Sequence, residues 1–142
     1  MQWDTAIDIA AGAGDVWSVL MDVESWPEWT ASMSSVKRLD VGPFRMGSHV
    51  RILQPKLPRA VWTVTEVDPV RSFTWVASGP GFTTTAEHRV EPASERSVRV
   101  SLSIRQSGPL APILGLFLSG ITRRYVTLEA EGLKRRCEAR SG

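Results

Sequence analysis

Short runs of alternating apolar and polar residues, separated by glycine and proline, make up most of the first 107 residues. Apolar side chains at every second position are typical of strands that bury one face, and Gly-Pro or Asp-Pro pairs are typical of the turns between them. This pattern predicts seven antiparallel strands, at Trp3–Ala10, Val36–Leu39, Ser48–Gln54, Ala60–Val67, Ser72–Ala77, Phe82–Val90 and Val98–Gln106.

One early segment, Asp15–Thr30, has the spacing of a helix instead. Gly14 and Asp15 can open this helix, and its apolar residues lie three or four apart, at Val16, Val19, Leu20 and Val23. Pro27 prevents one continuous helix because it has no N–H to donate and clashes with the preceding turn. We therefore expect two short helices after the first strand, the second of which carries Trp26 and Trp29 at a cavity mouth or a sheet corner.

A long helix is predicted from Leu110 to about Cys137. Its apolar residues recur three or four apart in two stripes, at Leu110, Leu114, Phe117, Ile121, Tyr125 and Leu128, and then at Val126, Ala130, Leu133 and Cys137. An antiparallel sheet of seven strands has one face to cover, and one helix is too narrow for this unless the sheet curls. The sequence thus predicts an α+β fold in which a curled sheet grips a C-terminal helix and encloses space.

Composition and charge narrow the domain count and the classes of partner. The 142 residues include 42% hydrophobic and 23% charged residues without a linker or repeat, which indicates a single domain over residues 1–142. Residues 1–30 carry six acids and no Lys or Arg, whereas the last 20 residues carry six cations. Cations near a helix end complement its dipole, and no nucleic-acid-binding motif is present, so we expect no nucleic-acid partner.

Cysteine usage and the apolar runs bear on location. Cys137 is the only cysteine, which excludes a disulfide within the chain and suits a reducing compartment. The acidic N-terminus does not resemble a signal peptide, and the longest apolar run, Leu110–Leu118, is far shorter than the roughly 20 residues that span a bilayer. We therefore expect a cytoplasmic protein without a transmembrane segment, and the sequence leaves a homodimer open.

The alternation within the strands also predicts which residues face the enclosed space. The expected ligand-binding wall consists of Val50, Ile52, Trp62, Phe73, Trp75, Ala86 and His88 from the strands, with Phe117, Ile121 and Tyr125 from the helix. In Ala60–Val67 two registers stay open, one with Trp62 inward and one with Val61 inward. The Val61 set carries two threonines that suit solvent, which favours the Trp62 register.

Few residues of this wall are able to do chemistry. His88 is its clearest polar point, and it is either a packed core histidine or a group that faces the ligand. Tyr125 can bond a ligand carbonyl or simply pack with its hydroxyl exposed. His49, His88 and Cys137 lack the spacing of metal ligands, and the chain has no nucleophile elbow, P-loop or dinucleotide fingerprint. We expect neither a metal nor a cofactor, and the sequence assigns no catalytic residue.

The stretch VWSVLMDVESWPEW (residues 16–29) lies between a strand and a run of strands, and it resembles the polyketide cyclase/dehydrase and lipid transport family. This family belongs to the START-like (SRPBCC, birch-pollen-allergen-like) superfamily. The segments WTVTEVDPVRSFTW (62–75) and HRVEP (88–92) and the terminal helix also fall where that family has them, so the resemblance covers nearly the whole chain. It implies a helix-grip fold with an apolar cavity, and the family has no universal catalytic motif.

Three functions are compatible with these observations. The leading hypothesis is the binding of a small hydrophobic molecule, such as a lipid, a polyketide, an isoprenoid or an aromatic metabolite. The alternative, implied by the resemblance, is a cyclase or dehydratase that folds a reactive chain in the same cavity and moves protons with one or two polar groups. The third is an interaction module whose cavity is packed shut by Trp62, Trp75 and Phe117.

Overall fold

The alternating segments form one seven-stranded antiparallel sheet in the computed structural model, which describes residues 2–141. The strands are β1 (Gln2–Ile9), β2 (Ser35–Arg38), β3 (His49–Leu53), β4 (Ala60–Asp68), β5 (Ser72–Gly79), β6 (Phe82–Ser94) and β7 (Ser97–Ser107). Their order across the sheet is β1-β7-β6-β5-β4-β3-β2. Successive strands from β2 to β7 are therefore neighbours, whereas β1 and β2 form the two opposite edges.

Two short helices connect these two edges, as the sequence predicts. They are α1 (Ala13–Met21) and the 3-10 helix η1 (Val23–Glu28), which contains Pro27. Helix α1 begins two residues before the expected Asp15. Its N-cap residue is Gly12, which has an extended backbone and makes no side-chain hydrogen bond to the helix. Asp15 lies in the first turn instead, where its negative charge interacts favourably with the positive end of the helix dipole.

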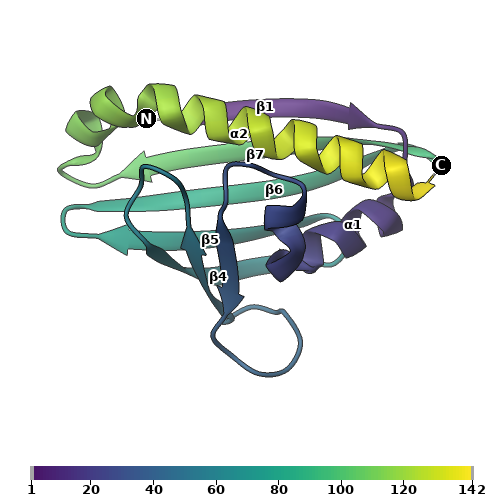
Figure 1. The fold of residues 1–142 in the computed structure, drawn as a ribbon, viewed down its shortest axis with the longest axis horizontal. Coiled ribbons are helices and arrows are strands. Elements are labelled where there is room, and N and C mark those ends of the chain that lie inside the picture. Colours follow the sequence, from purple (N-terminus) through teal and green to yellow (C-terminus); the bar gives the residue numbers. More distant parts are fainter. Residues whose placement is uncertain (1, 142) are drawn as a thin grey trace.

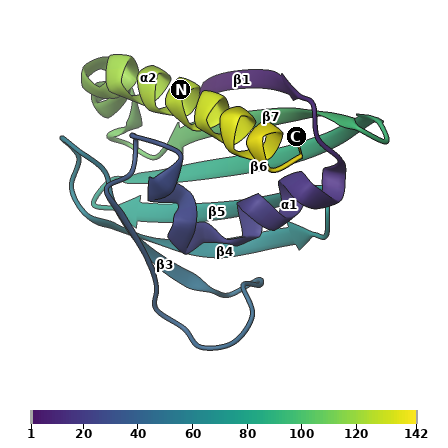
Figure 2. The same cartoon turned by 45° about the vertical axis from the view of Figure 1, so that its right-hand side comes forward.

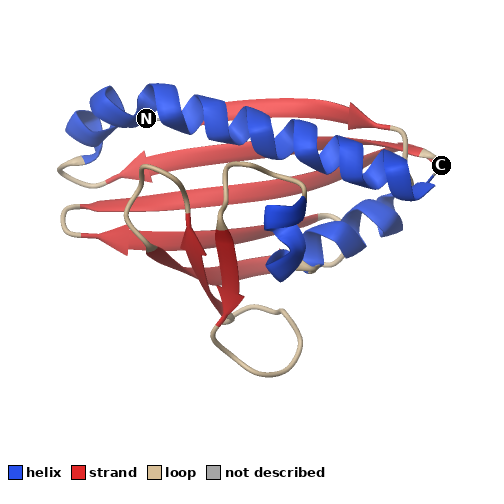
Figure 3. Cartoon of the chain, viewed as in Figure 1, coloured by secondary structure: helices blue, strands red, loops and turns tan. Residues whose placement is uncertain are grey.

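The long helix α2 (Ala111–Ser141) crosses the same face of the sheet as α1, which confirms the helix-grip prediction. Figure 3 shows both helices in front of the strands, and Figures 1 and 2 show α2 lying along β1 and β7. The C-terminal half of α2 holds to β1 through two contacts. Lys134 Nζ donates a hydrogen bond to the Asp8 carbonyl at 2.7 Å, and the Ala10 N–H donates one to Glu138 Oε2 at 2.9 Å.

The two predicted stripes of α2 differ in their outcome. The later stripe, Val126, Ala130, Leu133 and Cys137, is buried against the sheet and the short helices as expected. The earlier stripe is wrong at its start, because Leu110 and Phe117 are 43% and 77% exposed. Ala111 and Gly115, two small residues, are the buried positions there.

The register of β4 combines both alternatives. Trp62 and Val64 are buried, as the favoured register predicts. A β-bulge between Val64 and Glu66 then shifts the pairing, so that Val67 lies opposite Phe73 and Glu66 is exposed. An extra residue in one strand exchanges the faces beyond it, which is why neither simple alternation holds over the whole strand.

A cluster of aromatic rings fills the space between the sheet and the short helices. Trp26 is fully buried at its centre, with its ring centroid 5.2 Å from that of Trp75 and 5.3 Å from that of Trp29. The Trp26 indole N–H donates to the Leu20 carbonyl at 3.1 Å, so its polar atom is satisfied. This cluster occupies the end of the sheet near η1, and open space remains beneath the middle of α2.

Candidate functional site

A cavity of about 640 Å³ lies between the inner face of the sheet and α2. Most of its wall is apolar or aromatic, with side chains from β3 to β7, from the loop before β4 and from one face of α2. The α2 side chains in the wall are Leu118, Thr122, Tyr125, Val126 and Glu129. This volume is within the roughly 300–1,000 Å³ of ligand sites, which argues against a cavity packed shut.

Six of the ten residues predicted for the wall line this cavity: Ile52, Trp62, Trp75, Ala86, His88 and Tyr125. The other four do not. Val50 and Phe73 are fully buried, and Phe73 packs in the aromatic cluster against Trp26 and His88. On α2, Phe117 and Ile121 lie outside the wall because the inward face is rotated by one residue, to Leu118 and Thr122.

The sequence reasoning missed several polar residues of the wall, and Gln106 and Glu129 show two reasons for this. Gln106 continues the inward alternation of β7 beyond Ile104, so this signal was present in the pattern. Glu129 follows Tyr125 by four residues, on the same face of α2, but the search for apolar stripes passed over it. A carboxylate at a buried helix position has no signature in periodicity, and only the fold identifies its partner.

That partner is His88. The His88 Nε2 and Glu129 Oε2 atoms are 3.1 Å apart, and the two side chains are 4% and 13% exposed. The imidazole stacks on Phe73 with centroids 4.2 Å apart and planes within 5°, and the edge of Trp26 contacts it. Stacking and the carboxylate together fix the ring orientation. Within residues 2–141, the other ring nitrogen, Nδ1, is buried and makes no hydrogen bond.

This pair places two side chains that can carry a proton next to each other in a mostly apolar wall. A neutral imidazole carries one donor and one acceptor nitrogen. His88 is therefore a residue of the type that acts as a general acid or base, with Glu129 as the group that orients it. The pair can equally act as a polar anchor that orients a bound molecule.

Tyr125 has a different role from the one expected. Its hydroxyl donates a hydrogen bond to the Pro55 carbonyl, in the loop between β3 and β4. This bond ties the middle of α2 to the loop that forms one side of the cavity. Tyr125 thus lines the cavity while its hydroxyl proton is already engaged.

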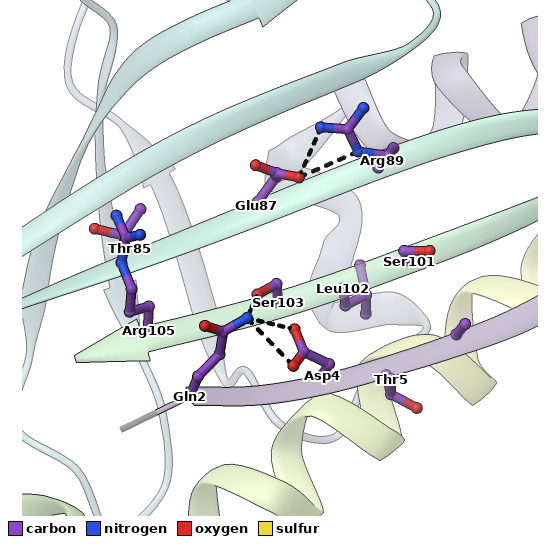
Figure 4. A pocket seen from close by; sticks show the side chains of 11 residues that line it. Gln2, Asp4, Thr5, Thr85, Glu87, Arg89, Ser101, Leu102, Ser103 and Arg105 are labelled. Atoms are coloured by element: carbon purple, nitrogen blue, oxygen red, sulfur yellow. Dashed lines mark hydrogen bonds and ion pairs between the residues drawn. The ribbon is translucent and has the colours of Figure 1, made fainter.

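A second depression, of about 610 Å³, lies on the opposite, outer face of β1, β7 and β6. Figure 4 shows interactions among its side chains, between Gln2 and Asp4 and between Arg89 and Glu87. Gln2 Nε2 donates to Asp4 Oδ1 at 3.0 Å, and Arg89 Nη2 donates to Glu87 Oε1 at 3.0 Å. Hydrogen bonds from Gln2 and Ser103 lower the pKa of Asp4. Because its wall is mostly polar and lies on the outer face of the sheet, this depression is the weaker candidate for an apolar ligand.

Metal and thiol chemistry find no support among the described residues. Within residues 2–141, no group of three or more His, Cys, Asp or Glu side chains is placed to hold a metal ion. Burial raises the pKa of the Cys137 thiol to about 11, so this cysteine is a protonated core residue at neutral pH. No helix within this range is long and apolar enough to cross a membrane.

The comparisons with known proteins agree with this architecture. The sequence profile described as polyketide cyclase / dehydrase and lipid transport matches residues 2–138. No curated protein matches the chain in sequence.

Solved structures share the fold at low identity. The Zhui aromatase/cyclase from Streptomyces sp. R1128 is 19% identical with a TM-score of 0.81, over 100% of this chain and 96% of that one. A START superfamily protein from Mycobacterium smegmatis is 16% identical with a TM-score of 0.75, over 97% of each chain. A norcoclaurine synthase from Thalictrum flavum is 12% identical with a TM-score of 0.79, over 100% of this chain and 96% of that one.

Proposed function

We propose that this protein, which belongs to the polyketide cyclase/dehydrase and lipid transport family, binds a small and mainly apolar molecule in the cavity between the sheet and α2. The single observation that carries the proposal is the cavity itself, about 640 Å³ with a mostly apolar and aromatic wall. Burial of apolar ligand surface supplies about 25 cal/mol per Å², and this is the main source of affinity in such a site.

The polar groups of the wall define how such a ligand is oriented. Trp62, Trp75 and Ala86 offer apolar contact, whereas His88, Gln106 and Glu129 are polar groups in the same wall. A ligand with a hydrocarbon or aromatic body and one carbonyl or hydroxyl group matches this distribution. A fully charged headgroup does not, because removing it from water costs more than one hydrogen bond returns.

Titration with an uncharged fluorescent probe, N-phenyl-1-naphthylamine, and with a long-chain fatty alcohol tests this proposal. We expect saturable binding at micromolar level and a change in tryptophan emission, because Trp62 and Trp75 line the cavity. The change Ala86→Trp should abolish binding by filling the space. Its matched control is Thr85→Trp. Thr85 is the preceding residue of β6 and lines the outer depression, so this change should leave affinity unchanged.

Unchanged affinity in a folded Ala86→Trp protein would contradict the proposal. The matched strand position makes the comparison specific, because both variants add the same side chain one residue apart. Overpacking costs about 1–3 kcal/mol, so thermal unfolding of both variants establishes first that they are folded.

A second candidate is an enzyme that performs acid–base chemistry in the same cavity. The specific observation in its favour is the buried His88–Glu129 pair in the wall, 3.1 Å apart. Two neighbours in structure are named for reactions, an aromatase/cyclase and a norcoclaurine synthase, which supports this candidate at the level of the fold. A cyclase or dehydratase needs a positioned chain and one group that removes a proton next to a carbonyl.

Hydrogen–deuterium exchange of an aromatic 1,3-diketone, followed by NMR in D₂O, tests this second candidate. If His88 acts as a base, the protein should accelerate exchange at the carbon between the carbonyls. Glu129→Gln should reduce the acceleration while retaining affinity for the apolar probe. Exchange at the rate of buffer alone would leave only the binding function.

A further inference from the structure

The first turns of α2 expose large apolar side chains to solvent. Leu110, Ile113, Leu116 and Phe117 are 43%, 56%, 75% and 77% exposed, and we call these four residues the rim patch. Single exposed apolar residues are ordinary, but a contiguous group on one short segment marks an interaction surface. In a helix, residues 113, 116 and 117 share one side, and the structure turns that side away from the sheet.

The rim patch lies beside the opening of the cavity. The Leu110 N–H donates to the Gly81 carbonyl at 2.9 Å, which joins the start of α2 to the turn between β5 and β6. Leu118 and Thr122, in the following turns, are part of the cavity wall, and so are the exposed Pro58, Arg59 and Pro80. Figure 1 shows the start of α2 and the β5–β6 turn at the same, left-hand end of the molecule.

Cations dominate the exposed charge near the rim patch. Three segments contribute residues to the cavity wall there, namely residues 53–59, 78–84 and 106–128. Their charged residues are Lys56, Arg59, Arg123 and Arg124, all exposed, and the next residue along α2, Glu129, is a wall residue whose carboxylate pairs with His88. Asp4 lies on the outer face of the sheet, where it accepts a hydrogen bond from Gln2. The rim patch is therefore an apolar surface edged by cations.

An apolar surface edged by cations favours an anionic lipid membrane over a second copy of the chain as the partner of the rim patch. A second copy of the chain would bring Arg123 and Arg124 toward the like charges of its partner, which opposes association. A membrane that contains anionic lipid offers the opposite charge together with an apolar interior. Helical segments with exposed large apolar residues and flanking Lys or Arg lie in the interface of such membranes.

We propose that the rim patch docks this protein onto the surface of an anionic lipid membrane. Leu116 and Phe117 enter the boundary between headgroups and acyl chains, while Lys56, Arg59, Arg123 and Arg124 contact lipid phosphates. The inference goes beyond the proposed function, because docking does not require an occupied cavity. It places the opening of the cavity against the bilayer, so that an apolar ligand passes between the two without crossing water.

Cosedimentation with lipid vesicles tests the docking surface. The full chain should bind vesicles of phosphatidylcholine mixed with phosphatidylserine. Its affinity for vesicles of phosphatidylcholine alone should be lower by about tenfold or more. Phe117→Ser and the double change Arg123→Gln, Arg124→Gln should each weaken binding to the mixed vesicles by about tenfold. Val41→Ser is the matched control, since Val41 is 97% exposed in a distant loop, and it should bind like the unchanged protein.

Equal binding by the unchanged chain and Phe117→Ser, or equal binding to both vesicle types, overturns the proposal. A dimer in gel filtration that Phe117→Ser dissociates overturns it as well, in favour of a second copy as the occupant. The result is separable from the cavity function. Ala86→Trp should bind vesicles normally, and Phe117→Ser should bind the apolar probe normally, because Phe117 does not line the cavity.

Discussion

At the scale of single residues, the closest approach between α2 and the short helices depends on one glycine. A Cβ placed on Gly132 would overlap the backbone oxygen and carbon of Trp29, which are rigid parts of the chain. Gly120, on the same helix, has open space in the same position. Gly132 therefore lets α2 pack directly onto the segment that holds the aromatic cluster in place, and so it fixes the end of the cavity.

Alanine substitutions at these two glycines should have opposite effects. Gly132→Ala forces backbone atoms apart, and we expect a loss of about 1–3 kcal/mol or more in the free energy of unfolding. Gly120→Ala should be neutral or stabilise by up to about 1 kcal/mol, because alanine favours the helix. Urea denaturation measures both. Equal midpoints for the two variants would contradict the close packing of α2 on Trp29.

The residue scale also shows what a sequence can reveal about the site. His88 was identified because it is a polar residue at an inward position of an alternating strand. Its partner Glu129 was not, because periodicity ranks apolar positions and says nothing of which carboxylate two distant elements bring together. Its hydrogen bond to His88 joins residues 41 positions apart in the chain.

At the scale of elements, α2 has two halves with different packing. From Leu110 to Ile121 nearly every side of the helix carries large apolar residues, so the pattern cannot say which side faces inward. The structure turns Leu118 toward the cavity and Phe117 to solvent. The second half is amphipathic, and there the predicted stripe is confirmed. The strands were predicted closely, and the bulge in β4 was not, because it has no local sequence signal.

The attachment of α2 to β1 should depend on pH. The backbone N–H of Ala10 and then the Lys134 ammonium bind Glu138 and lower its pKa below the ordinary 4.5. Since the folded-state pKa is the lower one, the unfolded chain binds this proton more tightly. The stabilisation is thus complete above the unfolded-state pKa and is lost as the pH falls through the folded-state value.

Glu138→Gln isolates this contribution, because it removes the charge and keeps the shape. We expect the variant to melt below the unchanged protein at neutral pH, and the difference in Tm to vanish in strong acid, where both side chains are neutral. Thermal unfolding followed by circular dichroism across this range measures it. A difference in Tm that stays constant down to strong acid would show that the contact does not act through the carboxylate charge.

At the scale of the whole molecule, the fold and the existence of an enclosed space follow from simple considerations of area. One helix cannot cover seven antiparallel strands unless the sheet curls, and a curled sheet leaves volume beneath the helix. The extent of this volume could not be predicted. It depends on how the rings of Trp26, Trp29 and Phe73 pack at one end, and on the bulge that sets the faces of β4.

The most direct test of the account is a crystal structure of the protein grown with the fatty alcohol. We predict electron density for the alkyl chain between Trp62, Trp75 and the Leu118 side of α2, with the hydroxyl end toward His88 or Gln106. Density confined to the outer face of β1 and β7, or a space closed by contact between Trp62 and Leu118, would contradict the account.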